Sequence, residues 1–511
     1  MFSAVYAGGL HGMEAYLVRV EVDISRGLPG FELVGSVAGD VKEAKERVTI
    51  ALKNAGISLP VAKITVNLSP ADIRKEGSGY DMAIAAGLLA CMGICNADSL
   101  QDTAFLGELA LNGEVNRVNG ILPIALALQK KGIKTMLVPE ANEEECGLVP
   151  GISLIGIPHI KKLLSYVQTS GEERNNCFPP FVKGKSIRKA VEKNQDFADV
   201  YGQESAKRAA EIATAGFHHL MIAGAPGTGK TMIAERIPQI LPPLSDAEQL
   251  EVFSIYSIAG KLKEMEHKAG RPFVSPHHTS SPQALAGGGR IPKPGLLSLS
   301  HRGILFLDEM PEFSQRVLEV LRQPLEEKQV QIARSGGTYV YPADFMLVCA
   351  MNPCPCGYYP DRNRCTCTES DIRRYLGRIS GPILDRIDIF AEAEPVQVKD
   401  FHRENKGEKT EVIRERVMEA RERQKIRYGG SPWQFNGELP GREVERYCKL
   451  GAGEQRFLEE VFESGQMSVR CYHKVIKLAR TVADLAGKER IAVNHLAEAV
   501  YFNSGKQRFW R

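Results

Sequence analysis

Eight residues decide the fold of the central part of this chain: Gly224-Ala225-Pro226-Gly227-Thr228-Gly229-Lys230-Thr231. They fit the pattern G-x-x-x-x-G-K-[ST] without a gap. An apolar stretch from His219 to Ala223 leads into them as a predicted strand, and a helix can run from Met232 onward. Glycines let backbone N–H groups converge on phosphate oxygens, and the helix N-terminus adds partial positive charge. Strand, motif and helix together predict a phosphate-binding loop rather than a chance glycine-rich turn.

The last two residues of the motif suit a nucleotide and its metal ion. Lys230 would reach the β- and γ-phosphates, and Thr231 would ligate Mg²⁺ through its hydroxyl. The loop therefore predicts binding of ATP together with Mg²⁺.

Two later apolar stretches end in polar residues that suit hydrolysis. Ile304–Leu307 predicts a buried strand and is followed by Asp308 and Glu309. Asp308 is placed to hold the Mg²⁺ water shell, and Glu309 to orient or deprotonate the attacking water. Phe345–Met351 predicts another strand that ends at Asn352, which could help to place that water. The alternative for Asn352 is an amide that caps a turn before a proline.

Composition places the chain among ordinary globular proteins of several domains. Its 511 residues predict about three domains at roughly 150 residues each, and 43% hydrophobic with 25% charged residues is ordinary. A net charge of +3 excludes a highly basic packaging protein, but not a nucleic-acid motor with a local positive stripe. The longest apolar stretch, Ala83–Cys95, is shorter than the roughly 18 residues of a membrane span. We expect no membrane segment, no secretory signal and a cytoplasmic location.

Hydrophobic patterns divide the chain into four segments and predict an α/β multidomain fold. Residues 1–167 alternate strand and helix patterns, which predicts a compact α/β domain. Residues 168–195 are polar, then proline-containing and basic, which predicts a linker with a short helix. Residues 196–394 alternate strands and helices around the phosphate-binding loop. Residues 395–511 show helical periodicity and predict an all-α C-terminal domain.

Segments around the loop resemble a known family. They are Asp199–Gln203, Arg271–Phe273 with Pro276–Thr279, and Arg378–Asp388. With them, residues 196–394 resemble an AAA+ P-loop ATPase module of the magnesium-chelatase type, and the whole chain is similar to the YifB/ComM family of magnesium-chelatase-like proteins. The resemblance implies a homo-hexameric ring with a helical C-terminal lid.

The resemblance also implies roles for residues around the nucleotide. Asn352 would be sensor 1, and Arg470, at the start of a C-terminal helix, would be sensor 2. The adenine pocket would be lined by Val200, Tyr201, Gly202 and Gln203.

An arginine finger is a further role that the resemblance implies. Arg386 would be donated to the ATP of a neighbouring subunit, where a guanidinium contributes about 10³–10⁵ in rate by stabilising the charge of the transition state. Arg378 competes for this role. The alternative for Arg386 is a salt bridge with Asp385 or Asp388.

Two segments are candidates for contact with DNA. Gln329–Tyr341 predicts a hairpin with a glycine-containing turn. In the family this position corresponds to a hairpin that points into the pore of the ring, where Arg334 would follow phosphates with help from Tyr339. The alternative is an ordinary surface hairpin with a solvated arginine. The glycine-rich stretch that contains Arg290 resembles the helix-2 insert, another pore element of related motors.

Four cysteines lie close together in the sequence, in two C-x-C pairs: Cys354, Cys356, Cys365 and Cys367. Thiolates suit tetrahedral Zn²⁺, and the nearby proline and glycine allow tight turns. C-x-C pairs are less diagnostic than C-x-x-C pairs. A structural zinc site and reduced thiols in a loop near the ATP site both stay open.

The N-terminal segment, residues 1–167, resembles the proteolytic domain of Lon, which has a ribosomal-S5-like α/β fold. The matching segments are Lys75–Asp81, Gly107–Gly120 and Gly132–Thr135 with Pro139. Lon needs a Ser–Lys dyad, but here the nucleophile position holds Gly79, with Ser78 one place early, and the general-base position holds Leu122. A serine without a lysine in reach is not activated. We therefore expect no protease activity and a role in binding DNA or a partner, or in stabilising the ring.

Two classes of function fit these observations. The first is an ATP-hydrolysing hexameric motor on single-stranded or branched DNA, a helicase or branch-migration enzyme of recombination or natural transformation. The alternative is a protein-remodelling ATPase, like the chelatase motor that drives metal insertion into porphyrin. Chelatase motors work with separate subunits and lack a Lon-like domain, so residues 1–167 favour the first class.

Overall fold

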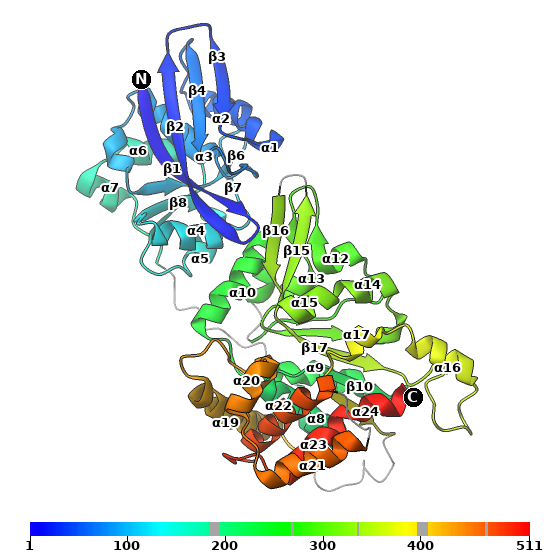
Figure 1. The fold of residues 1–511 in the computed structure, drawn as a ribbon. Helices are drawn as coiled ribbons and strands as arrows, with labels where there is room; N and C mark the ends of the chain where they lie inside the picture. The colour runs from blue at the N-terminus through cyan, green and yellow to red at the C-terminus, as the bar shows by residue number, and fades with distance from the viewer. Residues whose placement is uncertain (183–194, 267–269, 335–336, 396–406, 465–468, 511) are drawn as a thin grey trace.

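The first 157 residues build a seven-stranded mixed sheet (Figure 1). The computed structural model describes residues 1–182, 195–266, 270–334, 337–395, 407–464 and 469–510. The strand order is β3-β4-β2-β1-β5-β8-β9. The bounds are β1 (Phe2–His11), β2 (Glu14–Ser25), β3 (Gly30–Val34), β4 (Lys63–Ser69), β5 (Thr103–Phe105), β8 (Thr135–Pro139) and β9 (Ser153–Ile157). β2 runs antiparallel to both β1 and β4, and the other pairs of neighbours are parallel.

Helices cover this sheet because their apolar residues match its buried positions. Val18, Val20 and Val22 alternate with more exposed residues along β2, as the sequence predicts. Every residue of helix α3 is buried, which is typical of a helix that is apolar on all sides. The helices are α1 (Gly39–Lys42), α2 (Ala44–Asn54), α3 (Asp81–Cys91), α4 (Ile121–Lys130), α5 (Glu143–Cys146) and α6 (Ile160–Gln168).

Part of the predicted linker packs onto this first sheet. Helix α7 (Gly171–Cys177) lies within it, and Arg174 donates a hydrogen bond of 3.0 Å to the carbonyl of Ser99. Phe178 is buried in the same core, with its ring 5.3 Å from that of Tyr166. The sequence predicts a short helix in this linker, and α7 is one; the basic part of the linker, residues 183–193, lies outside the described residues.

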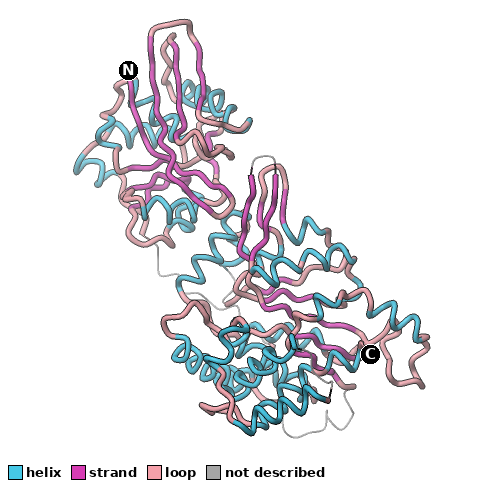
Figure 2. Tube along the Cα trace, viewed as in Figure 1, coloured by secondary structure: helices cyan, strands magenta, loops and turns pink. Residues whose placement is uncertain are grey.

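A second, fully parallel sheet carries the phosphate-binding loop, in the strand order β11-β14-β17-β10-β18 (Figure 2). The strands are β10 (Leu220–Gly224), β11 (Phe273–Val274), β14 (Ile304–Leu307), β17 (Met346–Met351) and β18 (Ile389–Ala393). The three central strands are buried along their whole length, as expected for a parallel sheet covered on both faces. Because the strands are parallel, the residues that follow β14, β17 and β10 meet at one edge.

Helices and short elements surround this sheet. Their bounds are α8 (Glu204–Gly216), α9 (Lys230–Ile240), α10 (Asp246–Ala259), α11 (Leu262–Glu266), α13 (Leu296–Leu299), α14 (Gln315–Val320), α15 (Arg322–Glu327), α16 (Glu369–Leu376) and α17 (Gly381–Leu384). The predicted hairpin is confirmed as β15 (Gln329–Arg334) paired with β16 (Gly337–Pro342), and residues 335–336 of its turn lie outside the described residues. The glycine-rich insert forms α12 (Pro282–Ala286), β12 (Gly287–Gly288) and β13 (Lys293–Pro294).

The described residues after 407 form helices and turns, as the periodicity predicts. The helices are α19 (Thr410–Tyr428), α20 (Gly441–Tyr447), α21 (Ala452–Glu463), α22 (Val469–Leu485), α23 (Val493–Asn503) and α24 (Gly505–Phe509). Ile413, Val417 and Ala420 form a buried stripe on α19 that packs with the strands of the second sheet in one core. Lys474 on α22 forms a 3.0 Å ion pair with Asp388, next to β18.

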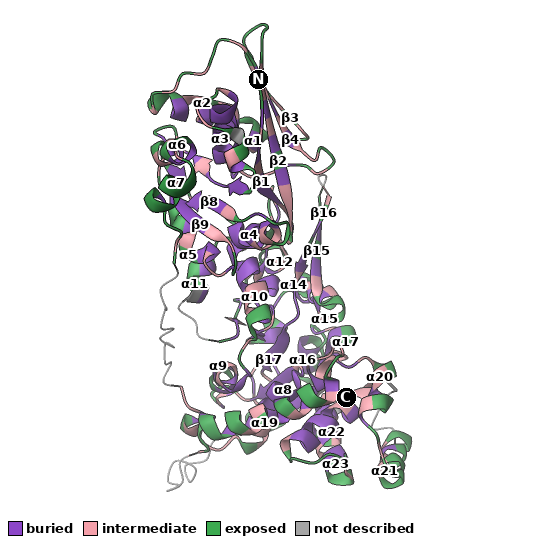
Figure 3. Ribbon diagram, turned by 90° about the vertical axis from the view of Figure 1, so that its left-hand side faces the viewer, coloured by how far each residue is buried: buried purple, intermediate pink, exposed green. Residues whose placement is uncertain are grey.

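The hairpin and helix α10 connect two units of the chain: the one built on the first sheet and the one built on the second sheet. Apolar residues of α4 and α10 share one core, and the amide of Gly120 donates 3.0 Å to the carbonyl of Ser257. The hydroxyl of Ser257 donates to Glu145, a buried carboxylate of α5. Figure 3 shows α4 beside the upper end of α10 and the hairpin reaching toward β1 and β2.

Among the described residues, no helix combines the length and the apolar character that a membrane crossing requires.

His219 makes the stability of the second sheet depend on pH. Its Nδ1 accepts a 3.1 Å hydrogen bond from the amide of Leu347, a role that only the neutral ring fills. Loss of hydration, the largest cause, lowers the pKa of His219 to about 4. Since an unfolded histidine has a pKa of about 6.5, the free energy of unfolding falls as the pH drops from about 6.5 toward 4.

We predict that the native chain loses about 2 kcal/mol more stability than His219→Gln between pH 6.5 and about pH 5, at about 1.4 kcal/mol per pKa unit. Glutamine keeps an acceptor and does not titrate in this range. Denaturant unfolding at several pH values measures the difference. His277→Gln, at an exposed loop position, should keep the native dependence. Equal pH dependence in His219→Gln and the native chain would contradict this role of His219.

Candidate nucleotide-binding site

The phosphate-binding loop lies between the end of β10 and the start of α9, as the sequence predicts. Gly227 and Gly229 have φ angles of +77° and +85°, which favour glycine. Gly224 lies against β18, where a Cβ would come within 2.4 Å of the Ala393 carbonyl oxygen. The hydroxyl of Thr228 donates 2.9 Å to the carbonyl of Ala225 and closes the loop. The backbone is thus shaped to present N–H groups at the helix N-terminus.

Lys230 is the central cation of this site. Its Nζ donates to the carbonyls of Gly224 and Ala225, both at 2.8 Å, and to Oδ1 of Asn352 at 3.1 Å. Burial lowers the pKa of Lys230, while the carboxylates of Asp308 and Glu309 act in the opposite direction. A cation held on neutral carbonyls at a buried position is ready to bind an anion.

Asp308 and Glu309 follow β14 directly, beside the loop. The hydroxyl of Thr231 donates 2.9 Å to Oδ2 of Asp308, which brings the two predicted Mg²⁺ ligands together. Glu309 is exposed and has φ +50° and ψ +47°, a left-handed conformation that is rare for a residue with a side chain. Such backbone strain is typical of functional sites, and here it falls on the predicted lytic residue.

Asn352 follows β17, which lies between β14 and β10 in the sheet. Its contact with Lys230 spans the two neighbouring strands β17 and β10. The side chain of Asn352 is therefore directed into the site. The alternative interpretation, in which this amide only caps a turn, does not include the contact with Lys230.

The predicted adenine segment runs from Val200 to Gln203, just before α8. Val200 is buried in the core and Tyr201 is 46% exposed. Gly202 and Gln203 both have left-handed φ angles, and Gln203 donates to the carbonyl of Glu394, just after β18. Arg236, on the helix that begins at Lys230, donates 2.7 Å to the carbonyl of Asp196 and so connects this segment to the loop. The sequence motif gave no indication that Arg236 makes this connection.

The arginine-finger candidates have partners within the chain. Arg386 pairs with Glu326, and also donates to the carbonyl of Pro382. Asp385 and Asp388, proposed as its alternative partners, pair with Lys506 and Lys474. Arg378 donates 2.9 Å to Glu312 and 3.1 Å to the carbonyl of Pro311, just after Glu309. The side chain of Arg470 lies outside the described residues.

All three DNA-contact candidates line one cavity, but only two of them are exposed. Arg290 and Arg334 are exposed and line, with Arg74, a cavity of about 380 Å³ between the insert, the hairpin and the first sheet's unit. Asp40 and Glu76 line the same cavity. Tyr339, however, is 3% exposed, because its hydroxyl donates 2.9 Å to Glu76 and its ring lies 4.3 Å from that of His11.

Tyr339 lines the same cavity as Arg290 and Arg334, so its part in DNA contact stays a prediction. Burial, with the hydrogen bond to Glu76, raises the pKa of Tyr339 to about 12. A phenol that donates to Glu76 and packs on His11 stabilises the contact between the hairpin and the N-terminal part of the chain.

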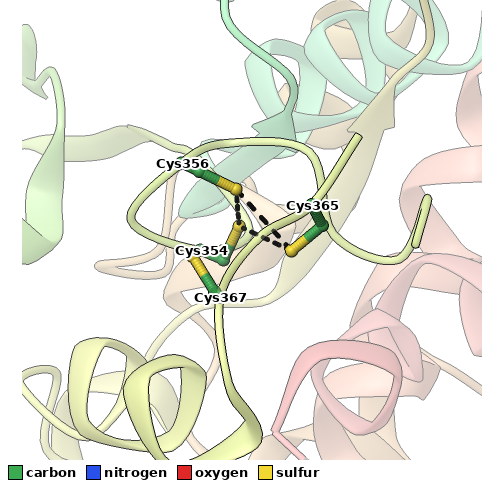
Figure 4. Close-up of side chains that lie close together, drawn as sticks. All are labelled: Cys354, Cys356, Cys365 and Cys367. Atoms are coloured by element: carbon green, nitrogen blue, oxygen red, sulfur yellow. Dashed lines mark hydrogen bonds between the residues drawn. The ribbon is translucent and has the colours of Figure 1, made fainter. Parts of the chain in front are cut away.

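The four clustered cysteines come together in the fold (Figure 4). Their ligand atoms all lie within 4.8 Å of one another, with Cys354 and Cys365 buried. Sγ of Cys354 is 3.4 Å from that of Cys356 and 3.8 Å from that of Cys365, and the last two are 3.6 Å apart. The amides of Gly357 and Tyr359 donate to the sulfur of Cys354.

The positions of the Lon-like dyad lie in the first unit of the chain. The hydroxyl of Ser78 donates to Glu108, and Nζ of Lys75 donates 2.9 Å to the carbonyl of Ile73. Gly79 and Leu122 have no functional group on their side chains, and Leu122 is fully buried. Ser78 thus has an acidic partner instead of a lysine.

Comparison with known proteins matches the chain in three parts. Residues 196–401 match the family model described as magnesium chelatase, subunit ChlI. Residues 20–142 match the model of subunit ChlI of Mg-chelatase, and residues 407–503 match that of its C-terminal part.

Individual relatives cover nearly the whole chain. Competence protein ComM of Haemophilus influenzae is 41% identical over 502 residues, which cover 98% of this chain and 97% of the relative. The YifB protein of Escherichia coli is 40% identical over 504 residues, with 98% and 97% covered. The magnesium-chelatase 67 kDa subunit of Heliobacterium mobile is 26% identical over 185 residues, which cover 30% of this chain and 28% of the subunit.

We predict that Glu309→Gln lowers ATP turnover by at least about 100-fold and leaves ATP binding near the native affinity, because the amide accepts no proton from water. Phosphate release and binding of a fluorescent ATP analogue measure the two properties. Lys230→Ala should lose binding itself. Glu327→Gln, at an exposed position on α15, serves as the matched control. Native turnover in Glu309→Gln would remove Glu309 from the lytic role.

Proposed function

This chain belongs to the YifB/ComM family of magnesium-chelatase-like proteins, and from that premise we propose that it is an ATP-hydrolysing AAA+ motor that acts on DNA as a ring of six subunits. One observation carries the proposal for ATP hydrolysis. Three neighbouring strands bring the residues of the site to one sheet edge, where Lys230 is hydrogen-bonded to Asn352 and Thr231 to Asp308, with Glu309 next in the chain. This is the set of groups that phosphoryl transfer needs.

Each residue of the site would have its own role in ATP hydrolysis. Loop amides and Lys230 would bind the phosphates, and Thr231 and Asp308 would hold Mg²⁺. Their adjacent oxygen atoms suit this hard cation, which neutralises phosphate charge when bound. Glu309 would take the proton of the attacking water, and Asn352 would orient that water.

A ring follows from the position that an arginine finger requires. We assign this role to Arg386, with Arg378 as the competing candidate. Arg386 pairs with Glu326, whose side chain is 58% exposed, and donates to the carbonyl of Pro382. A neighbouring subunit's triphosphate would compete with this half-exposed carboxylate for the guanidinium, which forms charge-assisted hydrogen bonds with phosphate as well as with carboxylate.

DNA is the proposed substrate because basic residues gather where the insert meets the hairpin. Arg290 and Arg334 are exposed there and Arg74 lies on the same cavity. Guanidinium groups bind phosphates without regard to base sequence, which suits a motor that moves along a strand. The relative named for competence supports a setting in natural transformation or recombination, with helicase or branch-migration activity on single-stranded or branched DNA.

Protein remodelling of the chelatase type is less well supported. Similarity to the Heliobacterium mobile chelatase subunit covers 30% of this chain, whereas similarity to ComM covers 98%. Proteolysis of the Lon type is disfavoured as well, because the hydroxyl of Ser78 is paired with Glu108.

Zinc is the second metal that we propose for this chain, bound by Cys354, Cys356, Cys365 and Cys367. A tetrahedral ion with Zn–S bonds of about 2.3 Å needs sulfur atoms about 3.8 Å apart. The separations of 3.4 to 3.8 Å among Cys354, Cys356 and Cys365 fit this requirement, and the sulfur of Cys367 lies within 4.8 Å of the others.

We predict that single-stranded or forked DNA raises ATP turnover of the native chain, and that Arg334→Ala reduces this stimulation more than it reduces turnover without DNA. The reason is that Arg334 supplies phosphate contact and not chemistry. Rising salt should weaken the stimulation, as counterion release requires. Arg456→Ala, at an exposed position on α21, is the control. A native chain whose turnover ignores DNA would overturn the DNA part of the proposal.

We predict that Arg386→Ala subunits lower the activity of mixed rings more steeply than their share of the mixture, because each removes the finger from a neighbour's site. Titration of native protein with the variant measures this effect. The same titration with Arg378→Ala decides between the two arginines. A decline that is proportional to the share of variant subunits in both titrations would refute action between subunits.

A further inference from the structure

The four-cysteine cluster lies directly beside the nucleotide site. Cys354 is only two residues after Asn352, whose amide contacts Lys230. We infer that the metal bound by this cluster fixes the position of Asn352 and supports the phosphate-binding loop, so that loss of zinc impairs nucleotide binding and hydrolysis. This inference rests on the proposed function and the proposed zinc ligands, and it assigns the zinc a task at the ATP site.

The first link runs along the backbone. Residues 352–368 form neither helix nor strand between β17, which ends at Met351, and α16, which begins at Glu369. A stretch of this length without regular structure is uncommon in a compact domain and usually has a functional task. Inside it, Cys354 and Cys365 are buried in the core. The sulfur cluster is therefore the feature that ties the two halves of this stretch together.

The second link is a direct contact with the phosphate-binding loop. Gly357 is buried and lies so close to Pro226 that a Cβ added at Gly357 would be 2.5 Å from Cδ of Pro226. The amide of the same glycine donates 3.2 Å to Sγ of Cys354. One residue thus contacts both the first sulfur of the cluster and the loop that holds phosphates.

The hydrogen bonds to the sulfur of Cys354 suit a metal ligand. The sulfur of Cys354 accepts from two amides, those of Gly357 and Tyr359 at 3.2 and 3.4 Å. Donors in this position orient a ligand and stabilise its negative charge. Four thiolates this close together would repel one another strongly without a cation between them.

Removal of the metal would release both links at once. Repulsion or rearrangement of the thiolates would free the stretch that starts at Asn352, and Gly357 would no longer press against Pro226. Nucleotide affinity depends on the shape of the loop, and turnover depends on the position of Asn352, so we expect both to decline.

The first test removes one ligand. Cys365→Ser takes away a sulfur that is distant in sequence from Asn352, and Cys177→Ser, at an exposed position on α7, is the matched control. Three quantities are measured on the full chain: zinc content by mass spectrometry, affinity for a fluorescent ATP analogue, and amide hydrogen exchange of residues 224–231. We expect zinc in the native chain and the control, its loss from Cys365→Ser, about tenfold or more weaker nucleotide binding, and faster exchange of the loop.

The second test keeps all four cysteines and disturbs the contact between Gly357 and Pro226. Gly357→Ala places a methyl group against Pro226, and Gly56→Ala is the matched control, because its φ of +88° equals that of Gly357 (+87°) within a degree and open space surrounds it. We expect Gly357→Ala to retain zinc but to show faster exchange at 224–231 and weaker nucleotide binding. Gly56→Ala should behave as the native chain. Gly357→Ala tests the inference even where Cys365→Ser does not fold.

Three results decide the matter. Native protein purified from zinc-containing medium without bound zinc overturns the metal site. Bound zinc whose removal by a chelator changes neither loop exchange nor nucleotide affinity overturns the supporting task. A native chain that hydrolyses no ATP, but whose loop exchanges faster without zinc, refutes the proposed function and supports the structural link.

Discussion

The hydrogen bond between Nζ of Lys230 and Oδ1 of Asn352 is the contact on which the site depends. It joins the residue that we propose for phosphate binding to the residue that follows the neighbouring strand β17. Because Lys230 is buried among carbonyl oxygens, its charge is compensated by dipoles and not by a carboxylate within hydrogen-bond distance in the described structure. A triphosphate can therefore gain the full attraction of this cation.

Several surrounding features serve to hold that contact in place. Thr231 and Asp308 connect the loop to β14, Arg236 connects its helix to the segment before α8, and Gly357 presses on the loop from the cysteine cluster. The first and third of these links join segments that follow parallel strands, and the second joins helix α9 to the segment before α8. The geometry of the site thus depends on packing at one edge of the second sheet. We infer that a change at the cysteine cluster alters the phosphate-binding loop through these contacts.

The part of the chain built on the first sheet contacts helix α10 and the hairpin of the proposed motor. Its helix α4 shares a core with α10, and Glu76 holds Tyr339 of the hairpin. The hairpin that the sequence suggests as a contact for DNA is therefore restrained on one face by the N-terminal part of the chain. Arg334 remains exposed at the cavity where the two units meet, so both units contribute side chains to the surface that we propose for DNA.

The sequence by itself determined the local features: the phosphate-binding loop, the apolar strands that precede Asp308 and Asn352, the hairpin, and the helical C-terminal part with α19 at residues 410–428. These depend on periodicity and on motifs within a few consecutive residues, which the order of amino acids encodes directly. Only the tertiary structure decided that Tyr339 is buried, that Arg386 pairs with Glu326, and that Gly357 touches Pro226. Those contacts join residues far apart in the chain, and their existence depends on how separate elements pack, for which no local pattern provides a signal.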